Sequence, residues 1–217
     1  MKAIIFDFDG LIMDTESVWF DAFYKVAKES FDIKINIKEF ALAVGTSEDS
    51  YLDLIEKQLG REMNRTEFSS KAKEKFDEQI LNIKPRDGVV DYLEYAKEKN
   101  LKIGLATSST YDWVEYYLKK FNIFHFFDSI KTSDIVGTKK PDPTVYIESL
   151  KSLGVLSNEV VAFEDSLNGF TAATKANIKT IVVPNALTKY ADFPLGTHII
   201  YSMGNISPED LLSSLTL

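Results

Sequence analysis

The sequence predicts an α/β protein: a parallel sheet with helices on both faces, and an all-helical insertion after the first strand. Two patterns indicate this fold class. From residue 85 onward, short apolar runs alternate with stretches of helical periodicity, which is typical of successive βαβ units. Residues 15–83 show helical periodicity without any strand pattern. We therefore expect a sheet domain of residues 1–13 and 84–217 and a helical domain of residues 14–83.

The first strand is expected at residues 3–6, an apolar run too short for a helix and followed at once by Asp7, Asp9 and Gly10. Side chains alternate along a strand, so Asp7 and Asp9 should project in the same direction. Two carboxylates that project together repel each other, and a bound cation is a common compensation. The end of this strand is therefore a candidate site.

The remaining elements follow from the same periodicities. In the insertion, helices are expected at residues 16–29, 37–44, 50–59 and 66–83, with breaks at Gly45 and Gly60. In the sheet domain, strands are expected at residues 102–107, 129–132, 159–163, 179–183 and 198–201, with helices at 89–100, 113–121, 145–153 and 167–176 and a last one after Ser207.

Polar clusters follow the strands of the predicted sheet domain. They comprise Asp7 with Asp9, Thr107–Ser109, Lys140, and Glu164 with Asp165. Ligands bind at the carboxyl edge of open parallel sheets, so we expect these clusters to converge there. Carboxylates are the hard oxygen ligands that suit Mg²⁺, and a lysine and a hydroxyl beside such an ion form a pocket for a phosphoryl group. A carboxylate is also a candidate for covalent catalysis through an aspartyl-phosphate.

The composition excludes several other classes of protein. There are 33 acidic and 25 basic residues, a formal net charge of −8, which disfavours nucleic acid as a partner. Cysteine is absent and only two histidines occur, which excludes thiol nucleophiles and thiolate metal sites and nearly excludes serine–histidine catalysis and histidine-rich metal clusters. Neither a secretory signal nor an apolar run of transmembrane length is visible, so we expect a cytoplasmic protein without a membrane partner. We also expect a monomer.

Together these clusters resemble the four motifs of the haloacid dehalogenase (HAD) superfamily, in the order of that family and over essentially the whole chain. The matching residues are Asp7-x-Asp9-Gly10 with Asp14-Thr15, Thr107-Ser108-Ser109, Lys140-Pro141 and Glu164-Asp165-Ser166. The helical insertion is similar to that of the β-phosphoglucomutase-like phosphatase branch. The resemblance implies a Rossmann-like core with an inserted cap of the C1 type and a Mg²⁺-dependent phosphatase that acts on a small phosphorylated metabolite, such as a sugar phosphate.

The same resemblance implies a role for each residue. Asp7 would be the nucleophile, and Asp9 the general acid and base, with its main-chain carbonyl on the metal. Thr107, the backbone amide of Ser108, and Lys140 would bind the substrate phosphate. Asp165 would complete the Mg²⁺ site, together with Glu164 either as a further ligand or as a neighbouring acid.

Two alternatives remain open at the level of the sequence. The first is a β-phosphoglucomutase or related mutase, which shares the aspartyl-phosphate. Mutases of this branch carry a histidine where this chain has Trp19, and an arginine in the cap loop where it has residues 45–49, none of them basic. Both departures favour hydrolysis. The second alternative is a phosphoaccepting or ligand-binding protein without turnover. The helical insertion argues against a receiver-type domain, and the presence of both Asp7 and Asp9 argues against loss of catalysis.

Overall fold

A computed structural model gives the fold of the protein and describes residues 1–41, 43 and 48–215. The chain divides into two compact units. The sheet unit comprises Met1–Met13, Lys84–Pro184 and Phe193–Leu217, and the helical unit comprises Asp14–Ile83 and Asn185–Asp192.

The sheet unit is built on six parallel strands in the order β3-β2-β1-β4-β5-β6. The strands are β1 (Ala3–Phe6), β2 (Lys102–Ala106), β3 (Ser129–Lys131), β4 (Val160–Glu164), β5 (Lys179–Val182) and β6 (His198–Ile199). The predicted fold class is confirmed. The first strand lies in the middle of the sheet between β2 and β4, so strand order reverses around it, which is where ligands bind in such sheets.

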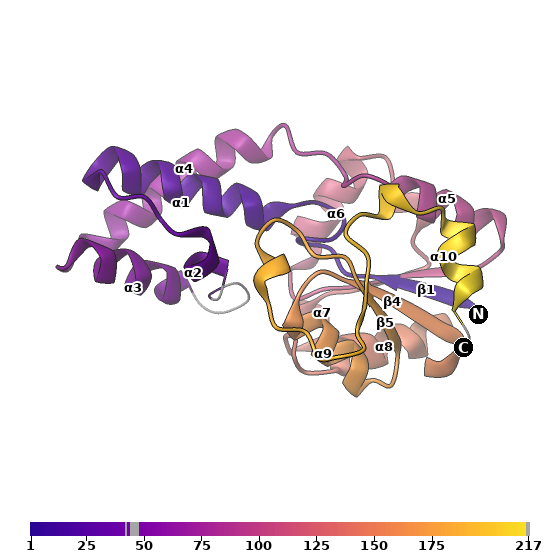
Figure 1. The fold of residues 1–217 in the computed structure, drawn as a ribbon. Coiled ribbons are helices and arrows are strands. Elements are labelled where there is room, and N and C mark those ends of the chain that lie inside the picture. Colours follow the sequence, from indigo (N-terminus) through magenta and orange to yellow (C-terminus); the bar gives the residue numbers. More distant parts are fainter. Residues whose placement is uncertain (42, 44–47, 216–217) are drawn as a thin grey trace. The chain divides into compact units, whose positions relative to one another are not determined.

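Helices cover both faces of this sheet (Figure 1). They are α5 (Val89–Glu98), α6 (Tyr111–Lys120), α7 (Ser133–Val136), α8 (Thr144–Leu153), α9 (Leu167–Lys175) and α10 (Pro208–Ser214). Ala3 and Ile5 of β1 pack in the apolar cluster that includes residues of α8 and α9. Phe6 instead stacks on Phe163 of β4, with ring centroids 5.3 Å apart, and Tyr92 of α5 contacts Phe163 edge-on at 5.3 Å. The alternation along β1 thus gives each face its own core.

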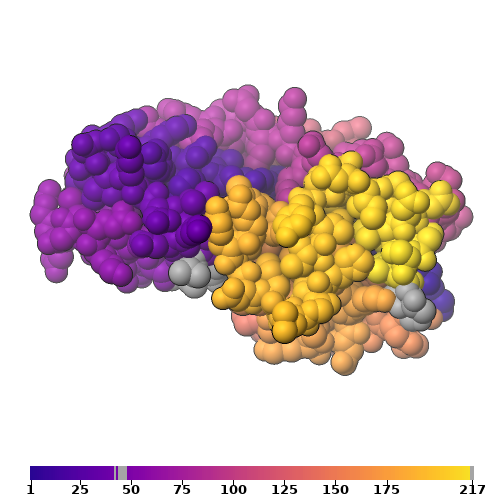
Figure 2. Space-filling model, in the orientation of Figure 1, coloured from indigo at the N-terminus to yellow at the C-terminus, as the bar shows by residue number. Residues whose placement is uncertain are grey.

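The C-terminal part of the sheet unit lies on its surface. Helix α10 begins with Pro208 and is capped by Ser207, whose hydroxyl oxygen accepts a hydrogen bond from the backbone of Asp210 at 3.1 Å. It packs beside α5, and the space-filling view shows these C-terminal residues, coloured yellow, on the viewed face (Figure 2).

The helical unit contains α1 (Thr15–Phe31), α2 (Ile37–Ala41), α3 (Glu48–Leu59) and α4 (Arg65–Ile80). Two caps define where its longest helices begin. The Asp14 carboxylate accepts from the backbone of Ser17, and the Asn64 side chain accepts from that of Glu67, each at 3.1 Å. The predicted helix at residues 37–44 runs partly outside the described residues, and α4 ends three residues before the predicted limit.

A segment of the C-terminal half, Asn185–Asp192, groups with the helical unit rather than with the sheet. Leu187 is completely buried in the apolar core that contains Phe23, Phe40 and Phe68 of the helices. The Asn185 side chain shapes the segment, because its Oδ1 accepts hydrogen bonds from the backbone of both Leu187 and Thr188 at 2.9 Å. The sheet domain predicted from the sequence, residues 1–13 and 84–217, includes this segment.

None of the helices in the described ranges is long and apolar enough to cross a membrane.

Candidate active site

The turn after β1 places Asp7 and Asp9 at the carboxyl edge of the sheet. The Asp7 amide donates to the carbonyl of Phe163 at 3.0 Å, which continues the pairing of β1 with β4 by one residue. Gly10 follows with φ of +85°, a conformation that residues with a Cβ adopt reluctantly, and its amide donates to the carbonyl of Met13 at 2.7 Å. The chain thereby reverses directly after the two acids.

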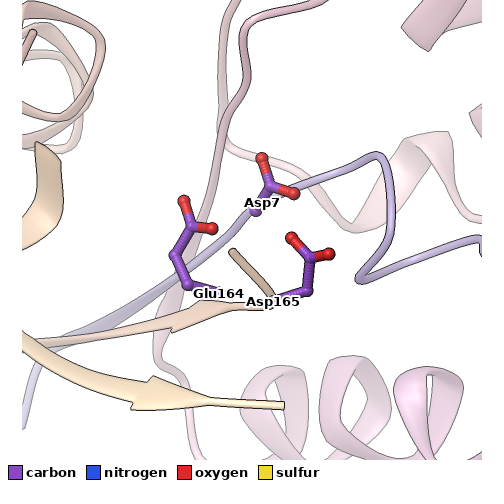
Figure 3. A group of neighbouring side chains, drawn as sticks. All are labelled: Asp7, Glu164 and Asp165. Carbon is purple, nitrogen blue, oxygen red and sulfur yellow. The ribbon is translucent and has the colours of Figure 1, made fainter. Parts of the chain in front are cut away.

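Three carboxylates meet at this edge. Asp7, Glu164 and Asp165 each contribute an oxygen, and these oxygens all lie within 4.8 Å of one another (Figure 3). They are buried, with exposed fractions of 6%, 0% and 2%. The register between β1 and β4 explains their meeting, because Phe6 lies opposite Phe163, one residue before Asp7 on one strand and one before Glu164 on the other.

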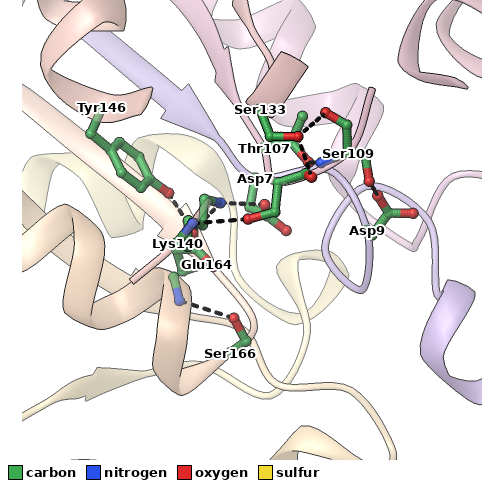
Figure 4. Close-up of polar contacts among 11 residues, drawn as sticks. Asp7, Asp9, Thr107, Ser109, Ser133, Lys140, Tyr146, Glu164 and Ser166 are labelled. Atoms are coloured by element: carbon green, nitrogen blue, oxygen red, sulfur yellow. Dashed lines mark hydrogen bonds and ion pairs between the residues drawn. The ribbon is translucent and has the colours of Figure 1, made fainter. Parts of the chain in front are cut away.

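Lys140 ties two of these carboxylates together (Figure 4). Its Nζ donates to Asp7 Oδ1 and to Glu164 Oε1, the second contact at 2.6 Å, and its side chain is only 5% exposed. The buried hydroxyl of Tyr146 on α8 donates to the same Glu164 oxygen. A buried ammonium with two carboxylate partners is charge-compensated, and these two bonds use two of its three donor hydrogens.

Burial and these neighbours shift the protonation of the cluster. Burial raises the pKa of Asp7 above its usual range, partly offset by the Lys140 charge. Burial, again opposed by Lys140, raises the pKa of Glu164 to about 7. Burial disfavours the Lys140 ammonium, but the charges of Asp7 and Glu164 outweigh it, so the pKa of Lys140 rises. Removal from water is thus the main cause of both raised acid pKa values, and the charge of Asp7 adds to the shift of Glu164.

The donor set fits a divalent cation that prefers oxygen ligands. The three carboxylates outnumber the one ammonium among them, so a cation there would lower the electrostatic cost of the cluster. Glu164 Oε2 is buried and, within the described ranges, has no hydrogen-bond partner. Such an orphaned oxygen is costly to bury and is the kind of atom that a metal satisfies.

The loop after β2 brings the predicted phosphate-binding residues into one network. The hydroxyl oxygen of Thr107 accepts from the Ser109 amide at 3.1 Å, and that of Ser108 accepts from the Lys140 amide at 3.1 Å. The hydroxyl of Ser133, at the start of α7, donates to the Ser108 carbonyl at 2.7 Å. Thr107, Ser108 and Lys140 are thus joined through the loop backbone, although their binding of a phosphate stays a prediction.

Asp9 faces a different set of partners from Asp7. The indole Nε1 of Trp113 on α6 donates to Asp9 Oδ1 at 3.1 Å. The hydroxyl of Ser109 donates to Asp9 Oδ2 (Figure 4). Its side chain is not part of the three-carboxylate cluster. The family resemblance implies that its main-chain carbonyl is a metal ligand, and this stays a prediction. The two acids of the opening motif therefore have separate environments.

A family model described as "Haloacid dehalogenase-like hydrolase" matches residues 4–183, which is most of the chain. The chain belongs to the haloacid dehalogenase-like hydrolase family. The resemblance seen in the sequence is thereby confirmed, and the chain is an enzyme of a hydrolase family.

Relatives within this family include several phosphatases. "Putative phosphatase YhcW" of Bacillus subtilis (strain 168) is 38% identical over 99% of this chain and 98% of its own length. The "Phosphorylated carbohydrates phosphatase" of Thermotoga maritima is 34% identical over 83% of this chain and 84% of its own length. Among solved structures, CbbY from Rhodobacter sphaeroides in complex with phosphate is 27% identical, with a TM-score of 0.69, and the match covers 94% of this chain and 95% of that one. The β-phosphoglucomutase from Clostridium difficile is 26% identical, with a TM-score of 0.69, and the match covers 98% of this chain and 96% of that one.

Four side chains around the site of this HAD hydrolase could not be assigned a role from the sequence. They are Trp113, Tyr146, Arg86, and Ser109 in its role as a partner of Asp9. Arg86 lies in the sheet unit just after the helical insertion, where its guanidinium donates to the carbonyls of Gly10, Val183 (3.0 Å) and Pro184 (2.9 Å). It therefore fixes the turn that follows Asp9 to the end of β5. The sequence shows that Arg86 follows Pro85 near the start of residues 84–217 of the predicted sheet domain. It does not show which carbonyls the guanidinium contacts.

Proposed function

We propose that this HAD hydrolase is a Mg²⁺-dependent phosphatase that hydrolyses a phosphate monoester of a small carbohydrate-like metabolite through an aspartyl-phosphate. The observation that carries the proposal is the Asp7 carboxylate, buried beside Glu164 and Asp165 and bonded to Lys140. The family resemblance implies that Asp7 is the nucleophile, and the neighbouring Glu164, Asp165 and Lys140 are the residues proposed for the metal and phosphate sites.

The first half of the proposed reaction transfers the phosphoryl group to the enzyme. A carboxylate oxygen of Asp7 forms a bond to phosphorus while the bond from phosphorus to the ester oxygen breaks. The leaving oxygen takes a proton from Asp9. Lys140 neutralises charge on Asp7 and the phosphoryl oxygens, and Thr107 and the Ser108 amide donate to those oxygens.

The second half restores the enzyme. Asp9, now ionised, accepts a proton from a water molecule, whose oxygen attacks phosphorus as the bond to Asp7 breaks. Inorganic phosphate leaves with that oxygen, and Asp9 is ready to act as an acid again. Asp7, Asp165 and Glu164, with the Asp9 carbonyl, are the residues proposed to hold Mg²⁺, which when bound supplies positive charge opposite the phosphoryl oxygens.

The carbohydrate part of the proposal rests on the relatives. One is named a phosphatase of phosphorylated carbohydrates, and Hexitol phosphatase B of Escherichia coli O157:H7 is 30% identical over 97% of this chain and 96% of its own length. These names support a sugar or sugar-alcohol phosphate as the class of substrate.

The first experiment measures hydrolysis of p-nitrophenyl phosphate with and without Mg²⁺. We expect turnover that EDTA abolishes and that added Mg²⁺ restores. The Asp7→Asn variant should lose activity by at least about 10³-fold while its circular dichroism is unchanged, because an amide cannot form the acyl-phosphate. Asp91→Asn, an exposed aspartate of α5, is the matched control and should keep full activity.

Failure of either expectation has a definite meaning. Turnover that persists in EDTA would contradict the metal requirement, and turnover by Asp7→Asn would contradict the nucleophile. If wild-type protein accumulates a stable phosphoryl group and releases no phosphate, the phosphoaccepting alternative is correct.

A mutase remains the second candidate because of the likeness to β-phosphoglucomutase. Trp19, at the position of the mutase histidine, stacks on Phe76 of the helical unit with ring centroids 4.0 Å apart, so it supplies packing where a mutase has a base. Of the cap-loop positions 45–49, residues 45–47 lie outside the described range, and Glu48 and Asp49 begin α3.

The discriminating assay offers β-glucose 1-phosphate with a trace of the 1,6-bisphosphate. A phosphatase releases inorganic phosphate, whereas formation of glucose 6-phosphate would establish the mutase. A panel of sugar and hexitol phosphates then ranks the substrates by kcat/KM.

A further inference from the structure

The carboxylate of Asp9 is held at both oxygens by the segment that follows β2. Trp113 donates to Oδ1 at 3.1 Å from the first turns of α6, and Ser109 donates to Oδ2 from the loop before that helix. Both donors and Asp9 itself are half-buried, so these bonds are partly shielded from water. Neither contact belongs to the three-carboxylate cluster.

The indole that makes this contact is itself fixed by its own helix. Trp113 meets the ring of Tyr117, one helical turn later, at 4.7 Å and an interplanar angle of 61°. Tyr117 is buried and also contacts Tyr116 and Phe121, with ring centroids 4.9 Å and 5.8 Å away. Aromatic contacts of this geometry restrict ring orientation, so the indole N–H has a defined direction.

We infer that Trp113 is a positioning residue that sets the orientation of Asp9 as general acid and base. The inference rests on the proposed function, in which Asp9 protonates the leaving oxygen and then accepts a proton from water. An indole N–H only donates, so its bond to Asp9 Oδ1 can form in one direction only, with the carboxyl oxygen as acceptor. A hydroxyl both donates and accepts, so Ser109 can turn and release Oδ2 to the reacting oxygen while Trp113 still holds Oδ1.

The two contacts therefore have different consequences. The bond from Trp113 keeps the side chain of Asp9 in one rotamer through both halves of the reaction, whether the carboxyl group carries a proton or not. Accurate placement of a general acid matters most when the leaving group is strongly basic, because such a group departs only with a proton. Loss of the indole N–H should thus harm poor leaving groups more than good ones.

The test compares two substrates of nearly the same shape, p-nitrophenyl phosphate with a weakly basic leaving group and phenyl phosphate with a more basic one. In Trp113→Phe, which keeps an aromatic ring against Tyr117, we expect kcat for phenyl phosphate to fall about 10-fold or more, within the range of general-acid effects. For p-nitrophenyl phosphate we expect a fall of about 3-fold or less, with KM for both unchanged. Tyr116→Phe, an exposed residue of the same helix, is the control and should leave the ratio of the two rates at the wild-type value.

A second measurement tests the contact without using activity. The chain has two tryptophans, so Trp19→Phe leaves Trp113 as the sole indole and its fluorescence reports on Asp9. In that background Asp9→Ala should shift the emission, whereas Asp91→Asn should not. This readout holds even if Trp113→Phe fails to fold.

The outcomes separate the inference from the proposed function. Equal losses on the two aryl phosphates, or emission that is insensitive to Asp9→Ala, would overturn the positioning role of Trp113. Absence of turnover by the wild-type enzyme with either substrate would instead refute the proposed function, and the fluorescence experiment would still decide whether the contact exists.

Discussion

At the scale of single residues, Glu164 is an acid enclosed on every side by the protein, with an exposed fraction of 0%. Its Oε1 accepts from both Lys140 and Tyr146, and its Oε2 lies against the backbone of Gly169 in the first turn of α9. The side chain is completely buried, so it has no exposed position to which it could move. The glycine is required here by close approach and not by its backbone angles.

Gly169→Ala should therefore damage the acidic cluster. A Cβ at this position would lie 1.8 Å from Glu164 Oε2 and 2.0 Å from its carboxyl carbon, so the carboxylate would have to leave its contacts. We expect a loss of about 1–3 kcal/mol in the free energy of unfolding, measured by urea denaturation, and weaker Mg²⁺ binding by calorimetry. Thr174→Ala, an exposed residue of the same helix, should change neither; equal stability of the two variants would contradict the close contact.

The raised acid pKa values predict that Mg²⁺ and protons compete for this cluster. An acid whose pKa is higher in the folded chain binds protons more tightly when folded, so its ionisation costs stability as the pH rises above its unfolded value. For Glu164 that cost develops between pH of about 4.5 and about 7. A cation removes the cost only where the carboxylates are ionised.

We therefore expect saturating Mg²⁺ to raise Tm more at pH 8 than at pH 5.5, measured by differential scanning calorimetry. The Asp165→Asn variant, which lacks one carboxylate charge of the cluster, should show a smaller Mg²⁺-induced increase in Tm at pH 8. A Mg²⁺-induced increase in Tm that is the same at both pH values would contradict competition between Mg²⁺ and protons for the buried acids.

Residues of this kind differ in how far the sequence reveals them. The meeting of Asp7 and Asp165 could be predicted because each directly follows a strand, and parallel strands bring their carboxyl ends to one edge. Lys140 follows α7 and was recognised by its family motif. Trp113 and Tyr146 could not, because each is an aromatic residue in an amphipathic helix and reads there as core. The contact of Trp113 with Asp9 spans 104 residues, and no local pattern encodes such a pairing.

At the scale of elements, apolar runs and periodicity were enough to locate the strands and the longer helices. The helix α7 (Ser133–Val136) was missed because four residues are too few to show a helical period. The helix α4 stops at Ile80 although helix-compatible residues continue, and such limits depend on tertiary contacts that periodicity does not contain. The position of the turn after Asp9 likewise depends on a partner distant in the sequence, the side chain of Arg86.

Arg86 joins three loop segments of the sheet unit. Besides its three guanidinium contacts, its amide donates to the carbonyl of Ile12 at 2.8 Å. A planar guanidinium can bond several carbonyls at once, whereas a lysine ammonium at the same place has a different geometry. The turn after Asp9 and the end of β5 are therefore held to one group.

Replacement of Arg86 should weaken both stability and catalysis. We expect Arg86→Ala to lose about 2–4 kcal/mol of unfolding free energy, because the buried carbonyls lose charged donors. Arg86→Lys should recover part of this loss. Turnover of p-nitrophenyl phosphate should fall in both variants, mainly through kcat, since the turn beside Asp9 is released. The exposed Lys84→Ala is the control, and a similar Tm for Arg86→Ala and Lys84→Ala would refute the role of Arg86.

At the scale of the whole molecule, the division into two units differs from a simple insertion. The helical pattern of residues 14–83 was evident in the sequence, but the contribution of Asn185–Asp192 to the same unit was not. That segment has no helical period, and its one fully buried leucine looks like any loop residue after a strand. Only the packing of Leu187 among the aromatic residues of the helices reveals where it belongs.

Leu187→Ala should destabilise the helical unit. Truncation of a fully buried leucine leaves a cavity and typically costs about 2–5 kcal/mol. Hydrogen exchange followed by mass spectrometry should show faster exchange in α1 and α4, with little change in β1 and β4. Leu195→Ala is the matched control, since Leu195 is fully exposed; faster exchange only in the strands would contradict the assignment of Leu187 to the helical core.

The placement of Asn185–Asp192 also determines how this protein can be recombined with its relatives. The chain passes between the two units between residues 13 and 14, 83 and 84, 184 and 185, and 192 and 193. A chimera that exchanges residues 14–83 alone would separate the incoming helices from the leucine that completes their core. A chimera that exchanges residues 14–83 and 185–192 together should have a higher Tm than the chimera that exchanges residues 14–83 alone. Exchange of the complete helical unit therefore requires matched changes at two distant places in the gene.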